Sequence, residues 1–464
     1  MSKRKTPAET PLQSLEPERP PARVLWVYAL GQLGWSLAAY GVSNLLIYFY
    51  MPPETGQPIF PPFVFQGAVL GVFTLIGILS AAGRFFDAVI DPLVANWSDR
   101  SKAPGGKRRW FLARGAVPFA LFATLVFYPL NTAESAGNFA WMAFCLLFYY
   151  FFFAFYVIPY TALIPELGHS PQDRMKISTL ISITWALGFI AGNSAYALQS
   201  YFEAQGQNSV QAFQTAQLLL NGAALVFMLI PGLFLNENRY ARQAPSDHRL
   251  RHALRVVMGN PNFRTFLASD LMYWLALNFI QLGIGFYVTL LFGLDKSYAF
   301  VFSLVSFLCS FAFYAPVLWL ERRLGKRRLM LSAFWLFIGL FIVVGGSRSL
   351  PFPKEMVLYV LGVVAAGPLA VFGILPNALI GDLVEQEEKS SGQQLAGMFF
   401  GVRAFVMKVG ISLANLLFPS LLLLGRSADN PAGVQLTTVM AVVFSLAGWQ
   451  FFRKFQEERP GQTH

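Results

Sequence analysis

The sequence predicts an all-α polytopic membrane protein with twelve transmembrane helices in two six-helix halves. Three observations lead to this fold class. The 464 residues are 55% hydrophobic and only 13% charged, about half the charge of a typical soluble domain. Apolar runs of about 20 residues recur along the whole chain, and each is long enough to cross a bilayer. Two motifs of the first half return in the second half in the same order.

Hydropathy and charge place the elements in chain order. The predicted spans are Val24–Tyr50, Phe63–Trp97, Trp110–Leu130, Phe139–Leu167, Ile177–Phe202, Ala212–Leu235, Phe263–Phe292, Tyr298–Leu320, Leu329–Gly345, Met356–Ile380, Ala396–Leu424 and Leu436–Phe452. This divides the chain into a disordered tail (1–22), an N-terminal half (23–235), a linker (236–262), a C-terminal half (263–452) and a second tail (453–464).

Basic residues predict the orientation of these spans. Both predicted tails, the linker and every second loop are rich in Lys and Arg, whereas the other loops contain only Lys296, Arg348, Lys354 and Arg426. The basic side of a membrane protein is cytoplasmic. We therefore expect both termini in the cytoplasm, as an even number of spans requires.

The repeat consists of two pairs of segments. Gly106–Arg109 and Gly325–Arg328 both read Gly-Lys-Arg-Arg, and Pro159–Leu167 resembles Pro376–Leu383 with one residue deleted. The offsets are nearly equal, and each pair follows the corresponding span of its half. Two parallel six-span repeats are the plan of rocking secondary transporters.

One span contains an unusual set of charges. Arg84, Asp87 and Asp91 share a helix face, and carboxylates at membrane depth are costly unless they meet a cation or a cavity. Lys408 lies about twelve residues into the eleventh span, near mid-depth. This pattern predicts a cation pathway, while a plain charge lock between helices is the structural alternative.

Four stretches resemble the major facilitator superfamily and, more closely, the glycoside–pentoside–hexuronide:cation symporters, the group that contains melibiose permease. They are Arg84–Pro92, Ser98–Ser101 with Gly106–Arg109, Ile158–Glu166 with Asp173 and Arg174, and Pro376–Lys408. The resemblance implies that Asp87 and Asp91 bind the coupling ion, as metal ligands if that ion is sodium, and that Lys408 is needed for coupling.

The sugar-binding pattern of melibiose permease is absent. Its aspartates in the first and fourth spans and its arginine in the fifth correspond here to Ser36, Val157 and Ser182. A sugar ring depends on such hydrogen-bonding partners. The sodium-dependent lysophosphatidylcholine symporters of the same broad group also lack this pattern, so a substrate other than a sugar stays open.

Other polar and aromatic residues are weaker candidates. Tyr156, Tyr160, Trp185, Asn193 and Asp270 could line a substrate cavity, although packing is the default role of each ring, and pairing with Arg264 is the alternative for Asp270. For Arg403 we expect pairing with Asp382 or contact with the interface. The candidates for gating networks are Arg84, Asp99, Arg100, Arg108, Arg109, Glu166, Arg174, Asp382 and Arg403.

The sequence thus predicts a cation-coupled symporter of a small organic solute, most readily a sugar or glycoside, working by alternating access. A carrier of lysophospholipid or another amphiphile and a transport-inactive sensor or scaffold are the alternatives. The coupling ion is sodium or a proton, and no other cofactor is expected. We expect a monomer in a bacterial inner membrane, with no enzyme activity and no nucleic-acid partner, because no catalytic cluster lies at membrane depth.

Overall fold

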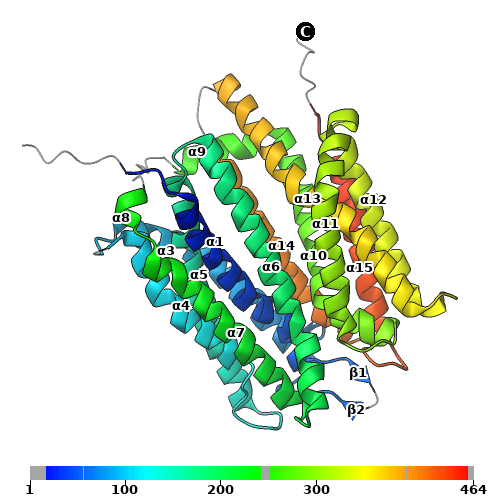
Figure 1. Ribbon diagram of the computed structural model, residues 1–464. Coiled ribbons are helices and arrows are strands. Elements are labelled where there is room, and N and C mark those ends of the chain that lie inside the picture. Colours follow the sequence, from blue (N-terminus) through cyan, green and yellow to red (C-terminus); the bar gives the residue numbers. More distant parts are fainter. Residues whose placement is uncertain (1–16, 56, 104, 242–249, 392–395, 458–464) are drawn as a thin grey trace, which may run out of the picture.

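The protein is a bundle of long helices that run roughly side by side (Figure 1). The computed structural model describes residues 17–55, 57–103, 105–241, 250–391 and 396–457. The helices are α1 (Ala22–Tyr40), η1 (Gly41–Leu45), α2 (Leu46–Tyr50), α3 (Leu75–Arg100), α4 (Lys107–Leu125), α5 (Ala136–Leu167), α6 (Pro171–Ala204), α7 (Ser209–Phe234), α8 (Glu237–Tyr240), α9 (Leu250–Gly259), α10 (Pro261–Phe286), η2 (Tyr287–Leu291), α11 (Tyr298–Leu324), α12 (Lys326–Gly345), η3 (Ser347–Ser349), α13 (Lys354–Ser391), α14 (Ala396–Leu422) and α15 (Ala432–Phe452).

The helices form two groups that meet along two seams. In the first group α1 packs on α6 and α7, and α4 packs on α5 and α7, with α3 against α5. In the second group α10 packs on α14 and α15, α11 packs on α13, and α12 packs on α13 and α15. The main contacts between the groups are those of α3 with α14 and of α6 with α11, and smaller contacts join α10 to η1 and α2. We call the two main contacts the α3–α14 seam and the α6–α11 seam.

The predicted second span begins too early. Residues 63–74 form a loop with the short antiparallel strands β3 (Ala68–Val69) and β4 (Phe73–Thr74), and helix α3 starts only at Leu75. The backbone conformation prevents a helix here. Leu70 and Gly71 both have positive φ, which a right-handed helix does not allow. Thr74 accepts a hydrogen bond from the Gly77 N–H and caps α3.

A second hairpin lies in the same connection. Strands β1 (Glu54–Thr55) and β2 (Gln57–Pro58) pair antiparallel, at the end of the bundle opposite the start of α1 and the end of α15 (Figure 1). We call this end of the bundle the hairpin end and the other the terminal end.

The predicted linker and the segment after the predicted tenth span both contain helix. The linker carries helices α8 and α9, and helix α13 continues past the predicted end of the tenth span at Ile380, through the acidic residues from Asp382, to Ser391. Most of both predicted tails, residues 1–16 and 458–464, lies outside the described part of the chain.

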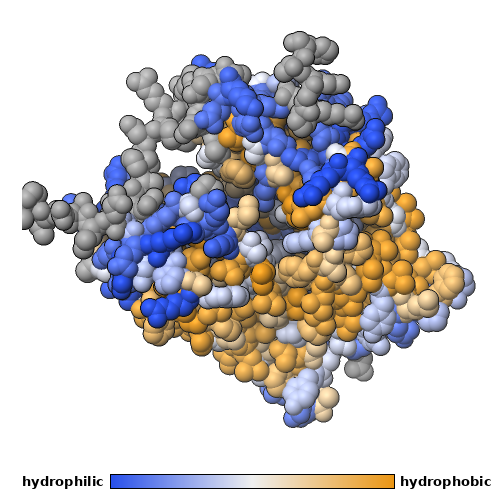
Figure 2. All heavy atoms as spheres, turned by 45° about the horizontal axis from the view of Figure 1, so that its top comes forward, coloured by the Kyte–Doolittle hydropathy of each residue, from blue (hydrophilic) through white to orange (hydrophobic). Residues whose placement is uncertain are grey.

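The surface is that of a membrane protein. Figure 2 shows hydrophilic residues gathered over the terminal end, with a broad hydrophobic surface below them. Nine helices of the described residues are long and apolar enough to span a bilayer. The segment from α1 to α2 is interrupted by η1, and α3 and α4 carry several charges, yet they pack in the bundle like the others. The all-α polytopic fold class is confirmed.

Candidate functional site

The charged face of α3 turns into the bundle. Arg84 and Asp87 are buried, with Asp87 fully inaccessible, and Asp91 lies one turn further with its side chain 23% exposed. Their spacing of three and four residues brings all three to one side of the helix. Phe85, Val89 and Leu93 are exposed on other faces of the same helix. The charged residues therefore lie on the face of α3 that points into the bundle.

Lys408 of α14 reaches across the α3–α14 seam to both carboxylates. Its Nζ lies 2.9 Å from Asp87 Oδ2 and donates a short hydrogen bond to Asp91 Oδ2. Only 14% of the Lys408 side chain is exposed. The sequence-predicted ion residues Asp87, Asp91 and Lys408 thus form one cluster that joins the two groups of helices.

Arg84 completes the cluster from the side of the first group. Its Nη2 donates to Ser43 Oγ of η1 at 2.6 Å, and its Nη1 lies 3.7 Å from Asp87 Oδ2. The guanidinium also lies over the rings of Tyr150 and Phe153 on α5, 5.4 and 5.7 Å from their centroids. These contacts fix Arg84 inside the bundle, so it does not lie in a gating loop.

The two carboxylates keep oxygen atoms free for an ion. Asp87 Oδ1 and Asp91 Oδ1 are buried and accept no hydrogen bond. A buried oxygen without a hydrogen-bond partner lowers the stability of the fold. Such an oxygen is suited to a ligand that occupies the site during only part of a transport cycle. The arrangement suits a monovalent cation or a proton, which would compete with the ammonium group of Lys408 for the two carboxylates.

A separate cavity of about 40 Å³ lies at the α6–α11 seam. Its wall is mostly aromatic and aliphatic, with neutral polar groups from Tyr40, Asn193, Gln281, Ser303 and Ser306. Asn193 Oδ1 and Ser306 Oγ are buried without a hydrogen-bond partner, and they come from opposite groups of helices. No charged residue lines this cavity. It can hold a few water molecules at this size.

Of the aromatic residues predicted to line a substrate cavity, Trp185 lies beside the cavity, whereas Tyr156 and Tyr160 do not. Trp185 contacts Phe307 edge to face beside the cavity, with ring centroids 6.0 Å apart. Tyr156 and Tyr160 are fully buried and donate their hydroxyls to the carbonyls of Met228 and Tyr28. Those contacts hold α5 against α7 and α1 and lie away from the cavity wall.

Asp270 and Arg403 form an ion pair inside the second group. Arg403 Nε and Nη2 donate to the two Asp270 oxygens at 3.0 and 3.2 Å, and Nη1 donates to Asn377 Oδ1 at 2.7 Å. The expected pairings of Asp270 with Arg264 and of Arg403 with Asp382 are therefore wrong. Arg403 is near enough in the fold to neutralise the buried Asp270 side chain, whereas Arg264 is exposed.

The three positions that correspond to the missing sugar-binding residues offer few polar groups to a ligand. Ser36 is buried and donates to the Gln32 carbonyl of its own helix, and Val157 is buried. Ser182 is exposed on α6 and donates to the Ser178 carbonyl. None of them supplies the paired carboxylate and guanidinium groups that bind a sugar ring.

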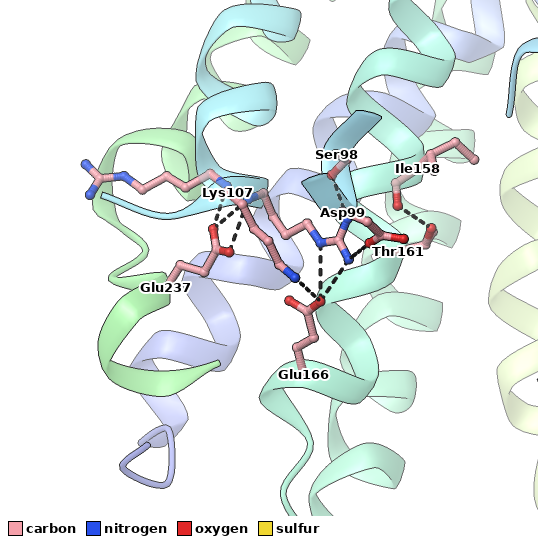
Figure 3. A network of polar contacts seen from close by, with 9 residues as sticks. Ser98, Asp99, Lys107, Ile158, Thr161, Glu166 and Glu237 are labelled. Carbon is pink, nitrogen blue, oxygen red and sulfur yellow. Dashed lines mark hydrogen bonds and ion pairs between the residues drawn. The ribbon is translucent and has the colours of Figure 1, made fainter. Parts of the chain in front are cut away.

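At the terminal end, Arg108 of α4 is the hub of an ion-pair network (Figure 3). It donates to Glu166 Oε1 from Nη2 at 3.0 Å and from Nε at 3.2 Å, to Ser98 Oγ at 2.6 Å, and to Asp99. Lys107 Nζ lies 4.0 Å from the same Glu166 oxygen. The network ties together the ends of α3, α4 and α5.

Sequence reasoning missed the glutamates that cap the repeated basic motif. Glu237 accepts from the backbone N–H groups of Arg108 and Arg109 at 2.8 and 2.7 Å (Figure 3). In the second group Glu457 accepts from the N–H groups of Lys326 and Arg327 at 2.7 and 3.2 Å. Both carboxylates occupy the positive end of a helix dipole. The two glutamates are 220 residues apart, nearly the same offset as that between the two basic motifs. This matching offset is the signal in the sequence that could have identified them.

The glycine of each basic motif makes this cap possible. Gly106 and Gly325 have φ values of 125° and 83°, which favour glycine. A Cβ at Gly106 would lie 2.4 Å from Glu237 Oε2, and one at Gly325 would lie 2.9 Å from Glu457 Oε2.

The remaining predicted gating residues have local roles. Asp382 pairs with Lys326 at 2.7 Å, the counterpart of the Lys107–Glu166 contact. Arg109 donates to the carbonyls of Gly232 and Leu233 at the end of α7, and Arg174 donates to the Gly168 carbonyl after α5. Arg100 is exposed at the end of α3.

Comparisons with known proteins cover nearly the whole chain. The family model described as MFS/sugar transport protein matches residues 27–449. The isoprimeverose transporter of Lactiplantibacillus pentosus is 24% identical over 433 residues, which are 92% of this chain and 85% of that protein. The sodium-dependent lysophosphatidylcholine symporter 1 of Mus musculus is 24% identical over 87% of this chain and 85% of its own length.

The fold is shared with solved transporters. The crystal structure of a D-xylose–proton symporter matches 95% of this chain and 99% of its own, with a TM-score of 0.67 and 14% sequence identity. At this identity the likeness concerns the arrangement of helices alone.

Proposed function

The chain belongs to the family of MFS/sugar transport proteins, and on this basis we propose that it is a symporter that couples an inward flow of sodium or protons to the uptake of a small neutral solute, most readily a glycoside. The two groups of helices are the halves of the transporter, 23–235 and 263–452, and they rock about the two seams. We place both termini on the cytoplasmic side, in the inner membrane of a bacterium.

The observation that carries this proposal is the position of Lys408 between Asp87 and Asp91. Its ammonium lies 2.9 Å from Asp87 Oδ2 and is hydrogen-bonded to Asp91, so a bound ion would need the same two carboxylate groups. Lys408 and the ion therefore compete for the carboxylates. An ion that enters displaces the ammonium, and because Lys408 belongs to the other half, loading the site alters the contact between the halves.

The solute would bind near the α6–α11 seam. Asn193 Oδ1 from α6 and Ser306 Oγ from α11 are buried and unpaired there, so a hydroxyl-bearing solute could satisfy one group of each half. The aromatic wall offers faces for an apolar or ring-shaped solute. The cavity would have to widen as α6 and α11 separate, which is what rocking of the halves does.

The test is thermal stabilisation of the purified protein by sugars, glycosides, uronates and lysophospholipids, each in sodium and in choline buffer at two pH values. A ligand at a hundredfold excess over its dissociation constant stabilises the native state by about 2.7 kcal/mol. We expect a glycoside to stabilise the protein more strongly in sodium or, if protons are coupled, more strongly at low pH.

The matched variant is Asp91→Asn, which keeps the size of the side chain and removes one carboxylate. It should still bind the solute but lose the effect of the cation. If no ligand shows any cation dependence in the parent protein, the symport proposal fails and a sensor or scaffold role is favoured.

A second candidate is a carrier of lysophospholipid or another amphiphile. It is favoured by the apolar lining of the cavity and by Ser36, Val157 and Ser182, which replace the groups that hold a sugar ring. In the same assay, stabilisation by a lysophospholipid together with none by any glycoside would favour this candidate.

A further inference from the structure

The hairpin end is closed by contacts between the two halves. The Glu54 N–H donates to the Arg426 carbonyl at 2.9 Å, and the Ala428 N–H donates to the Glu54 carbonyl at 3.2 Å. These bonds make a parallel β-bridge between Glu54 and Ser427. Glu54 belongs to the long connection before α3, and Ser427 to the connection between α14 and α15, so a backbone pair joins the halves.

Side chains reinforce this bridge. Arg426 Nε donates to Glu54 Oε1 at 3.0 Å, and its Nη2 donates to Gln66 Oε1. The Arg426 side chain is only 12% exposed although Glu54 is 56% exposed. The arginine is therefore mostly shielded from solvent, and it contacts both Glu54 in the hairpin and Gln66 beyond it.

A second ion pair closes the α6–α11 seam at the same end. Lys296, in the connection before α11, places its Nζ 2.6 Å from Glu203 Oε2 near the end of α6. The Lys296 side chain is 10% exposed, and Gln199 donates to the other Glu203 oxygen at 3.0 Å. Each seam thus has its own charge pair at the hairpin end.

The terminal end is different. There, the ion pairs Arg108–Glu166, Lys326–Asp382 and Arg403–Asp270 each join helices of a single half. Polar contacts between the halves are found at mid-depth, where Lys408 meets Asp91, and at the hairpin end.

We propose that Glu54, Gln66, Arg426, Ser427 and Ala428, together with Glu203 and Lys296, form an outer latch that holds this transporter closed on the outer face and open toward the cytoplasm. The proposal rests on the proposed function and orientation. The latch has to break at both seams before a solute can enter from outside, because each of its two parts bridges the halves independently.

The first test is a disulfide across the β-bridge. Partners in a bridge lie about 4.8 Å apart, within the Cα range of disulfides, so Glu54→Cys and Ser427→Cys should cross-link under mild oxidation. The background lacks Cys145 and Cys309, and a protease site placed within residues 242–249 separates the halves on a denaturing gel unless a disulfide joins them. Cross-linking should also stop uptake, and reduction should restore it.

The control pair lies at the terminal end of the α3–α14 seam. Arg100→Cys and Gly397→Cys are also on different halves, and both positions are exposed. We expect this pair to cross-link far less than the latch pair in the absence of solute. Equal cross-linking of the two pairs, or failure of the latch pair to cross-link, would overturn the proposal whether or not a transported solute is known.

The second test follows the opening of the latch without a disulfide. Ser306→Cys places a small thiol in the buried cavity wall, and an impermeant maleimide is added on the side of the hairpin end. Its labelling should rise about fivefold or more when Glu54→Gln and Glu203→Gln remove both charge pairs. The matched control is Glu18→Gln, which removes an exposed pair that joins the N-terminal tail to Arg239 of the linker and does not join the halves. Unchanged labelling in the latch variant would contradict the latch.

Discussion

Lys408 has two neighbours of opposite charge, and they differ in burial and in their other contacts. Asp87 is fully buried and also faces Arg84, whereas Asp91 is partly exposed and has Lys408 as its ion-pair partner. The two carboxylates are therefore unequal, and the more accessible one is the natural entry point for an ion.

Asp91→Asn should abolish cation-driven accumulation and leave the protein folded. Lys408 keeps its contact with Asp87, so no buried ammonium is left unpaired. We expect accumulation to fall about a hundredfold, since a lost charged partner is worth roughly 3 kcal/mol. Uptake into proteoliposomes with and without an ion gradient measures this. Normal gradient-driven uptake by the variant would refute the assignment of Asp91.

Lys408→Ala should bind the coupling cation about tenfold more tightly, because the competing ammonium is gone. It should still fail to couple the ion to the solute, since the link between the halves is lost. Cation-dependent thermal stabilisation reads the affinity. Lys408→Arg keeps the positive charge and serves as the control; if Lys408→Ala binds no more tightly than Lys408→Arg, competition is not the role of this lysine.

Among the elements, α4 and α12 begin in the same way. Each starts at a Gly-Lys-Arg-Arg motif and is capped by a glutamate from the segment that follows the last helix of its half. The equivalence explains why the motif occurs twice: its glycine makes room for the carboxylate, and its next residues expose the N–H groups that bind it.

Glu237→Ala and Glu457→Ala should each lower stability by about 1–2 kcal/mol, the usual cost of a lost helix cap. The midpoint of thermal unfolding in detergent measures both, and each variant is the control for the other. A large effect of one with none of the other would show that the two caps are not equivalent.

Close helix packing allows a second prediction at this scale. A Cβ at Gly188 of α6 would lie 2.1 Å from Ser36 Oγ and 2.8 Å from the Leu33 carbonyl on α1. Gly188→Ala should therefore destabilise the protein by about 1–3 kcal/mol. Gly222→Ala on α7 is the control, because its Cβ meets nothing within 4 Å; it should be neutral or slightly stabilising. Equal melting midpoints for the two variants would argue against close α1–α6 packing.

At the scale of the whole molecule, the orientation in the membrane decides whether the latch closes the outer or the cytoplasmic side. Alkaline phosphatase fused after Asn430 should be active, because the proposed orientation puts that loop on the outer side, and a fusion after Phe455 should be inactive. Reversed activities would place the latch on the cytoplasmic side.

Much of this molecule could be predicted from the sequence, because apolar runs and basic loops report directly on the bilayer. The cluster of Asp87, Asp91 and Lys408 was predictable for the same reason, since charges at membrane depth need partners. The loop from Phe63 to Thr74 could not be predicted, because its residues are as apolar as those of a transmembrane span. Only the backbone conformation at Leu70 and Gly71 prevents a helix there. The pairs Asp270–Arg403 and Glu54–Arg426 join distant segments, so neither local pattern nor spacing announces them.

The net charge of the ion cluster determines how the membrane voltage acts on the transport cycle. Arg84 and Lys408 balance Asp87 and Asp91, so the cluster without an ion is neutral, and with an ion it carries one positive charge. If these residues bind the coupling ion, the membrane voltage acts on the loaded carrier, by about 2.3 kcal/mol per charge for each 100 mV, and leaves the return of the empty carrier unaffected. Raising the voltage should then speed uptake only until the empty carrier's return limits the cycle, and currents should saturate at strongly negative potentials.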